Sequence, residues 1–489
     1  MKRKVSSLVV LSITALVFGT LTADQPGEAG ALGDRLDQTT LAGMSVTRGA
    51  AEGLRIFTTP FNTLDGYGDG PLDTVDTISP GGRPTLQGNG ALLRINGLDA
   101  QACFECHTLV SNATVPATLG IGGSGGTNSN AMFQASAVDP ADLDDLDGEA
   151  AFNGRFINPP FVFGVGGVEL VGLEMTADLQ ALKQQAIDSP GVPVSLDTKG
   201  VNFGAIVADG LGNVDTSGVE GVSDDLVVRP FGRKGEFATT RDFDLGAMMF
   251  HLGIQPTEVV GEGVDGDGDG VIDEITVGEI SALGVFLSTL ARPEQAKLTT
   301  EAEQGASLFS SMGCAACHVP SLGTDTRLLP LRFPEVATDP SINVYKEIDL
   351  TKKPANFNSN GAGGVDVPMF ADLKRHDMGP DLAEDFALAD PATNAEFTTA
   401  KLWGVADSGP WLHDGRALTI SDAILMHGGE AQAERDNFAA LTDNQKKSVL
   451  AFLRTLNTPR PSPPGSNHPR TLRATGVTDD RGGTTVTRH

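Results

Sequence analysis

The chain has 489 residues, which is enough for two or three packed cores. Apolar residues make up 40% of it and charged residues 20%, and this composition excludes a chain that is disordered throughout. The formal net charge of −28 disfavours binding to the phosphate backbone of a nucleic acid.

The N-terminal pattern predicts a secretory signal peptide over residues 1–23. Lys2, Arg3 and Lys4 precede an apolar run that is too short for a comfortable membrane span, and small and polar residues follow the run. An uncleaved N-terminal anchor is the alternative. We expect an acidic protein that is periplasmic or secreted and has no membrane span once the leader is removed.

The four cysteines fall into two copies of one pattern, Cys103-Phe104-Glu105-Cys106-His107 and Cys314-Ala315-Ala316-Cys317-His318. Each copy is C-x-x-C-H, the attachment signal of c-type haem. Two thiols at this spacing form thioether bonds with one porphyrin, and the histidine that follows becomes the proximal iron ligand. A thioredoxin-like pair, a zinc site and disulfides are the alternatives, but a structural zinc leaves both adjoining histidines unexplained. The pattern predicts two covalently bound haem c groups.

The cysteine motifs belong to a longer internal repeat. Each copy begins with a short helix signal, at residues 53–57 and 305–309. Each copy ends with an amphipathic helix that stops at a proline. The capping boxes that open these two helices are Thr276 with Glu279 and Thr442 with Gln445. Small haem c domains pack an N-terminal and a C-terminal helix across each other, and these segments suit that role.

The repeat predicts a mainly α fold with two cytochrome c-like haem domains and long irregular loops. The N-terminal domain, with haem 1, spans residues 24–293, and the C-terminal domain, with haem 2, spans residues 294–460. Residues 461–489 are rich in Pro, Arg and Thr and have no apolar period, so we expect a disordered tail.

Two histidines occupy equivalent places in the repeat and are the first candidates for distal iron ligands. His251 precedes the last helix of the first copy, and His427 precedes the last helix of the second. A core or surface histidine is the alternative for both. Met378, 60 residues after His318, competes as a distal thioether. The choice matters because Met raises the haem potential relative to His.

An acidic insertion in the N-terminal domain has the ligand order of an EF-hand loop. The residues at positions 1, 3, 5, 7 and 9 are Asp265, Asp267, Asp269, Val271 and Asp273. Position 12 is Thr276 rather than the bidentate Glu, and Glu279 is a substitute whose capping role competes. The loop predicts a structural Ca²⁺ site, with a solvated acidic turn as the alternative.

Four further segments resemble a known family, the bacterial di-haem c-type oxidoreductases. These are relatives of the di-haem cytochrome c peroxidases and of the di-haem enzyme that matures methylamine dehydrogenase. The segments that carry the resemblance are residues 158–169, 231–235, 372–380 and 402–431. The resemblance covers most of residues 45–455.

The resemblance implies two unequal haems. One haem is fully ligated and relays electrons, and the other, the N-terminal haem on His107, opens a site for peroxide. His427 falls where the peroxidase group places the distal ligand of its C-terminal haem, which is usually Met there. Glu169 is the candidate for proton transfer to the leaving oxygen, with Asp242 and Asp244 as fallbacks. A surface or loop-capping role is the alternative for Glu169.

Three functions remain open at this point. The first is a peroxidase-like oxidoreductase that reduces hydrogen peroxide at haem 1 with electrons relayed through haem 2. The second is an electron-transfer protein in which both irons are six-coordinate. The third is a haem-dependent oxygenase. In each case we expect a redox partner protein, a basic small cytochrome or cupredoxin, because the chain is acidic. Adaptation to salty surroundings would also explain the charge.

Overall fold

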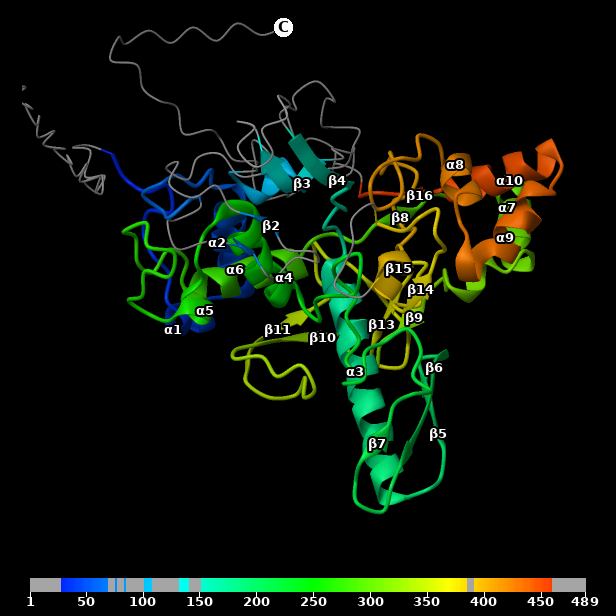
Figure 1. Ribbon diagram of the computed structural model, residues 1–489, viewed down its shortest axis with the longest axis horizontal. Helices are drawn as coiled ribbons and strands as arrows, with labels where there is room; N and C mark the ends of the chain where they lie inside the picture. Colours follow the sequence, from blue (N-terminus) through cyan, green and yellow to red (C-terminus); the bar gives the residue numbers. More distant parts are fainter. Residues whose placement is uncertain are drawn as a thin grey trace, which may run out of the picture.

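The computed structural model describes residues 28–68, 75–76, 83–84, 101–107, 132–139, 151–384 and 391–459. The predicted signal peptide and the predicted disordered tail lie outside these residues. Two groups of helices lie at opposite sides of the molecule, and a long helix with several small sheets lies between them (Figure 1). Among the described residues, no helix has both the length and the apolar character needed to cross a membrane.

The first helix group is built on a close crossing of α2 (Val46–Thr58) with α6 (Val277–Ser288). Gly53 makes the crossing possible, because a Cβ atom at this position would lie 2.0 Å from the carbonyl oxygen of Ala282. One turn further along, the rings of Phe57 and Phe286 are 5.4 Å apart between centroids and tilted by 58°. The two helices therefore touch through backbone at one turn and through aromatic rings at the next.

The second group repeats this crossing with α7 (Thr300–Ser311) and α10 (Asp443–Leu453). A Cβ atom at Gly305 would lie 1.9 Å from the carbonyl oxygen of Ser448. The rings of Phe309 and Phe452 are again 5.4 Å apart and tilted by 58°. The two pairs thus share one geometry, which is the structural form of the repeat seen in the sequence.

Both predicted capping boxes are confirmed. In α6 the Thr276 hydroxyl accepts from Glu279 N at 3.2 Å, and Glu279 Oε2 accepts from Thr276 N at 2.8 Å. In α10 the corresponding bonds between Thr442 and Gln445 are 3.4 and 3.0 Å. Each box satisfies two backbone N–H groups that the first helical turn leaves without partners.

A third apolar core lies between the helix pairs, around α3 (Val165–Asp188). It includes residues before and after position 293, the predicted domain boundary; examples are Leu170, Phe203, Leu329, Val367 and Trp403. The two ends of the C-terminal segment meet where β8 (Glu294–Gln295) pairs with β16 (Leu456–Asn457). The middle core therefore packs parts of both predicted domains together.

The prediction of a mainly α fold is wrong, because the described residues contain seven small sheets beside the helices and the content is mixed α/β. Three hairpin sheets are β1–β2 (Val75–Asp76, Arg83–Pro84), β3–β4 (Met132–Asp139, Ala151–Ile157) and β10–β11 (Leu328–Arg332, Val344–Asp349). The others are β5–β6–β7 (Val194–Thr198, Val201–Ala208, Val214–Asp215), β12–β13–β9 (Asn358–Ser359, Val365–Val367, Leu322–Gly323), β14–β15 (Arg375–Asp377, Glu396–Thr398) and β8–β16.

Apart from β8 and β16, the strands lie in the insertions that separate the helices of each pair, which the sequence interpretation treated as irregular loops. In β5, buried and exposed residues alternate along the strand, as expected for a hairpin with one face on the core. The remaining helices and turns are α1 (Gln38–Gly43), η1 (Cys103–Glu105), α4 (Thr240–Ala247), η3 (Met248–Leu252), α5 (Thr257–Val260), η4 (Cys314–Ala316), η5 (Pro391–Ala395), α8 (Ile420–Leu425), η6 (Gly429–Ala431) and α9 (Gln432–Ala439).

Candidate functional site

The first C-x-x-C-H motif forms a tight turn, η1, against the core of the first helix pair. Cys106 is buried in this core and Cys103 packs at its edge. His107 N bonds to Cys103 O at 3.0 Å, and His107 Nδ1 lies 2.6 Å from the carbonyl oxygen of Pro160. Burial lowers the pKa of His107 to about 4, so its imidazole is neutral. The carbonyl fixes the Nδ1–H tautomer and leaves Nε2 for a metal.

The second motif forms the same turn, η4, against the second helix pair. Cys314 packs on this core, and His318 N bonds to Cys314 O at 3.0 Å. His318 Nδ1 lies 3.1 Å from the carbonyl oxygen of Phe370. Burial, followed by the charge of His427, lowers the pKa of His318 to about 4. This histidine is therefore also neutral and also directs Nε2 away from its carbonyl partner.

His427 faces His318 across a gap that suits a metal. The two ring centroids are 6.4 Å apart. An iron atom bonded to one nitrogen of each ring, at about 2 Å per bond, places the centroids on the order of 6 Å apart. His427 Nδ1 lies 2.8 Å from Ala423 O, so its Nε2 is also left for a metal. These residues fit a haem iron held between two imidazoles.

Met378, the competing ligand, lies beside the same loop. A Cβ atom at Gly428 would be 2.9 Å from the carbonyl oxygen of Met378. The contact joins the backbone of Met378 to the residue that follows His427, so the two segments that carry the candidates are adjacent. The ring distance between His318 and His427 favours the histidine as the ligand.

His251 lies on η3, a π-helical turn that continues α4. Such turns are frequent at functional sites because they re-aim a side chain within a helix. The ring edge of His251 packs on Phe250, with centroids 4.8 Å apart. Its charge is among the causes that lower the pKa of His107, after burial, so the two histidines are neighbours. The structure therefore brings a second imidazole to each C-x-x-C-H turn.

Glu169 lies on α3 and is buried, with 1% of its surface exposed, so it is not the surface residue that the sequence left open. Its Oε2 accepts from Thr240 N at 3.0 Å and from Thr240 Oγ1 at 2.8 Å. Thr240 begins α4, and Phe243 in the next turn packs its ring edge-on against His107. Burial raises the pKa of Glu169. Glu169 is therefore a buried protonatable group bonded to the first residue of α4, the helix that packs on His107 through Phe243.

The two fallback carboxylates gather at the same place. Burial raises the pKa of Asp242, and burial with the charge of Glu169 raises that of Asp244 well above its ordinary value. Sequence reasoning missed Glu335, whose pKa burial and Glu169 raise to about 8. It also missed the fully buried Arg332, which lies 3.4 Å from Glu335. We call Glu169, Asp242, Asp244 and Glu335 the carboxylate cluster.

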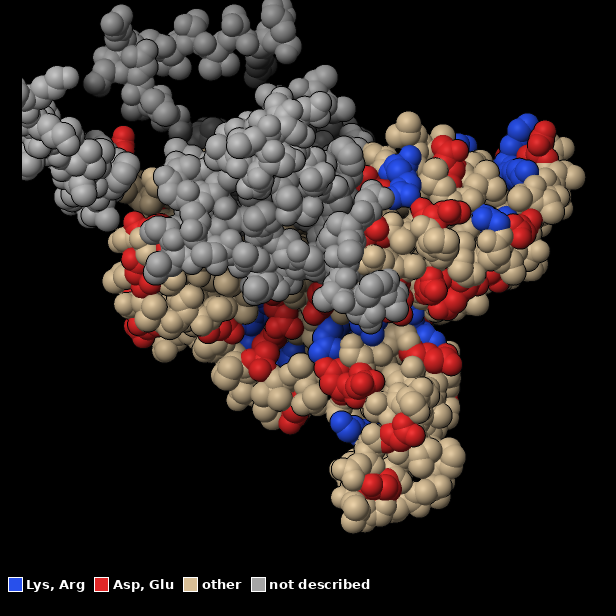
Figure 2. All heavy atoms as spheres, in the orientation of Figure 1, with Lys and Arg blue, Asp and Glu red and all other residues tan. Residues whose placement is uncertain are grey.

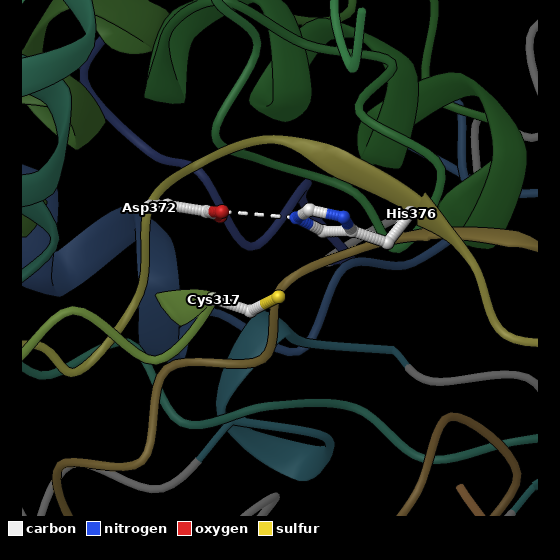
Figure 3. A group of neighbouring side chains, drawn as sticks. All are labelled: Cys317, Asp372 and His376. Atoms are coloured by element: carbon white, nitrogen blue, oxygen red, sulfur yellow. Dashed lines mark hydrogen bonds and ion pairs between the residues drawn. The ribbon is translucent and has the colours of Figure 1, made fainter. Parts of the chain in front are cut away.

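A second missed group surrounds Cys317. His376 Nε2 lies 2.9 Å from Asp372 Oδ2, and His376 Nδ1 lies 2.7 Å from Glu430 Oε2. Figure 3 shows the Asp372 carboxylate facing the His376 ring, with Cys317 Sγ beside them. Glu430 is three residues after His427, so these bonds tie the His427 loop to the second C-x-x-C-H turn. The signal in the sequence was His376 itself, which had no assigned role.

The acidic loop is only partly arranged as predicted. Ligand oxygens of Asp265, Asp267 and Asp269 all lie within 4.8 Å of one another. Asp273 instead accepts from Gly263 N at 2.7 Å through Oδ1. Glu279, the proposed substitute, is bonded to Arg35 and to the helix cap.

Part of the chain is similar to known proteins. Residues 245–456 match a family model described as "Di-haem oxidoreductase, putative peroxidase". The family resemblance is confirmed over this segment. Cytochrome-c peroxidase IdrP1 of Denitromonas iodatirespirans is 27% identical over 177 residues, 34% of this chain and 43% of that protein. Cytochrome-c peroxidase IdrP2 of Pseudomonas sp. (strain SCT) is 26% identical over 192 residues, 36% of this chain and 48% of that protein. The chain thus spans less than half the length of these relatives.

Two solved structures show a weaker likeness. A MauG-like protein associated with microbial copper homeostasis is 17% identical, with a TM-score of 0.22, over 37% of this chain and 53% of that chain. Hydrazine synthase of Kuenenia stuttgartiensis is 16% identical, with a TM-score of 0.22, over 37% of this chain and 55% of that chain. Scores this low support no argument about the site.

Proposed function

We propose that this chain is an exported di-haem c-type cytochrome oxidoreductase that reduces peroxide at haem 1 with electrons relayed through haem 2. The observation that carries the proposal is the contrast between the two sites. His318 and His427 face each other at a distance that suits one iron. His107 also has a histidine neighbour, His251, but in addition its site adjoins α4 and the carboxylate cluster.

The cysteines and histidines of the two turns would hold the cofactors. Cys103 and Cys106 would bind haem 1 and Cys314 and Cys317 haem 2, each through two thioether bonds. Once bound, the haem irons supply a coordination site for peroxide and a path for electrons. His427, rather than Met378, is our choice for the sixth ligand of haem 2. A nitrogen ligand there lowers the potential relative to a thioether.

Glu169 supplies a proton for cleavage of the O–O bond. Reduction of hydrogen peroxide to two water molecules takes up two electrons and two protons, and one proton must reach the leaving oxygen. Both bonds from Thr240 go to Glu169 Oε2, which leaves Oε1 to hold the proton. Asp244 and Glu335 lie close enough to Glu169 for its charge to add to the rise that burial gives their pKa values, so they can replace the proton that Glu169 gives up.

The electron-transfer alternative has one observation in its favour. His251 is a neighbour of His107, as His427 is of His318. A permanent bond from His251 to the first iron would close both sites and leave an electron carrier. The peroxidase proposal requires His251 to leave the iron when the protein is reduced, and the π-helical turn on which it lies supports such a movement.

The electron donor we propose is a small basic cytochrome or cupredoxin in the periplasm or outside the cell. Acidic side chains are spread over the visible face of both helix groups, with basic side chains between them (Figure 2). Together with the net charge of −28, this surface favours salt-sensitive encounters with a basic partner.

The test is peroxide-dependent oxidation of a reduced small basic cytochrome by the di-haem protein. The substitution Glu169→Gln removes the proton but keeps an acceptor for Thr240, so we expect turnover to fall by about 100-fold or more. Glu174→Gln, five residues along α3, is the matched control, because Glu174 accepts from Asp325 N instead. Equal activity of Glu169→Gln and the wild type would show that Glu169 does not donate the proton.

A further inference from the structure

Three aspartates of the acidic loop converge, and backbone N–H groups of the same loop hold their carboxylates. Asp265 accepts from Gly268 N and Gly270 N, and Asp267 and Asp269 each accept from the N–H two residues further on. Oxygens of Asp265, Asp267 and Asp269 lie within 4.8 Å of each other, and Asp267 has only 1% of its surface exposed. Gly268 and Gly270 have φ values of 80° and 97°, a conformation that lets the backbone curl inward. Like charges at this separation repel one another unless a positive charge lies between them.

A fourth carboxylate, Glu274, indicates that this positive charge is a bound cation. It is 1% exposed, and its Oε2 accepts from Gln255 N at 2.7 Å. Among the residues that the structure describes, no hydrogen-bond donor reaches its buried Oε1. Burial raises the pKa of Glu274 to about 10, and the charges of the three aspartates add to the rise. A buried oxygen in this position needs either a proton or a cation.

The residues that the EF-hand pattern assigned to the remaining positions are engaged elsewhere. Asp273 bonds to Gly263 N through its side chain and to Arg35 through its carbonyl oxygen. Glu279 is bonded to Arg35 and caps α6. Glu274, at position 10 of the loop, is therefore the carboxylate available to complete the cluster.

We infer that Asp265, Asp267, Asp269 and Glu274 bind one Ca²⁺ ion, with Glu274 in place of the missing bidentate glutamate. Ca²⁺ accepts six to eight oxygen ligands in flexible geometry, which suits carboxylates from an irregular loop, whereas Mg²⁺ demands a near-ideal octahedron. The carbonyl of Val271, at position 7, is a further candidate ligand. The site does not depend on the proposed function.

The ion would join three segments of the N-terminal half. Glu274 bonds to Gln255, which is four residues after His251. Gly66, which follows α2, packs so closely on Glu274 that a Cβ atom there would be 2.3 Å from its Cδ. A bound cation therefore stabilises the contact between the loop and the residues that flank the first helix pair.

The test compares two neighbouring substitutions in the holo-protein after treatment with a chelator. A calorimetric titration of Ca²⁺ into the wild type should show one bound ion per chain. Thermal unfolding should show a higher Tm with Ca²⁺ than without it. Glu274→Gln should weaken this binding at least about tenfold. Asp273→Asn, which changes the adjacent carboxylate in the same way, should bind Ca²⁺ as the wild type does.

The Tm values of the Ca²⁺-free proteins give a second test that does not depend on measuring Ca²⁺ binding. In this test the substitution should stabilise the protein. Without the ion, Glu274→Gln should have a higher Tm than the wild type at neutral pH, because the wild type must take up a proton at Glu274 when it folds and the glutamine variant need not. No Ca²⁺ binding by the wild type would overturn the inference. So would tighter binding of Mg²⁺ than of Ca²⁺, or an equal loss of binding in Asp273→Asn and Glu274→Gln.

Discussion

At the scale of single residues, burial gives the site its chemistry. The same loss of solvent that lowers the pKa values of His107 and His318 to about 4 raises those of Glu169 and Glu335. Neutral imidazoles are suited to bind iron, and protonated carboxyls are suited to give up protons. One physical cause therefore prepares both the proposed iron ligands and the proposed proton donors.

The pKa of Glu335 leads to a prediction about stability and pH. Its pKa is about 8 in the folded protein against an ordinary value of 4.5. Between these values the folded state holds a proton that the unfolded chain has lost, so the free energy of unfolding falls as pH rises through this window. Glu335→Gln should flatten that fall and give a higher Tm than the wild type at the upper end of the window.

Thermal unfolding measured across this pH range checks the prediction. Glu220→Gln is the control, since the carboxylate of Glu220 is largely exposed and lies outside the carboxylate cluster. Wild type and Glu335→Gln losing stability in parallel would show that Glu335 does not carry the folded-state proton.

At the scale of elements, the two helix crossings depend on one glycine each. Gly53→Ala would place its Cβ atom 2.0 Å from a backbone oxygen, which no change of side-chain rotamer can relieve. We expect a loss of about 3 kcal/mol of folding free energy, at the upper end of overpacking costs. Gly43→Ala, at the end of α1, meets no atom within 4 Å and should change stability by less than about 0.5 kcal/mol. Denaturant midpoints of the two variants measure the difference, and similar midpoints would contradict the account of the crossing.

The sequence predicted the elements whose contacts are local and missed those whose contacts are distant. A capping box joins residues three apart, and the C-x-x-C-H turn joins residues four apart, so both could be recognised from spacing. Arg332 and Glu335 reach the carboxylate cluster from a hairpin more than 150 residues after Glu169. Short strands such as β13 carry too few residues to show alternation, and the mainly α prediction failed for this reason.

The acidic loop shows that prediction from spacing also fails for some residues that are close together in the sequence. The EF-hand pattern assigns ligands by position, and three of the residues that it names, Asp265, Asp267 and Asp269, lie together. It could not anticipate that Asp273 adopts a φ of 53° and bonds back to Gly263, while Glu274 is buried beside Gln255. Which of two adjacent carboxylates faces the loop depends on backbone conformation that the spacing does not encode.

At the scale of the whole molecule, the middle core sets how the two predicted haem sites are held. Trp403 packs in this core, its ring 6.3 Å from that of Phe357, and a Cβ atom at Gly164 would lie 2.8 Å from it. Gly164 is the N-cap of α3, the helix that carries Glu169. One packed unit therefore connects the carboxylate cluster with strands of the C-terminal segment, and the fixed separation that it gives the two predicted haem sites suits the proposed electron relay.

The measurement that tests the account most directly is the electron paramagnetic resonance spectrum of the holo-protein, recorded fully oxidised and again after one-electron reduction. Two irons of unequal coordination should give a low-spin signal from the His318–His427 site in the oxidised protein. A high-spin signal from the His107 site should be present after reduction of the other haem. Two low-spin signals, with no high-spin species at either stage, would show that both irons are closed and that the protein carries electrons without reducing peroxide.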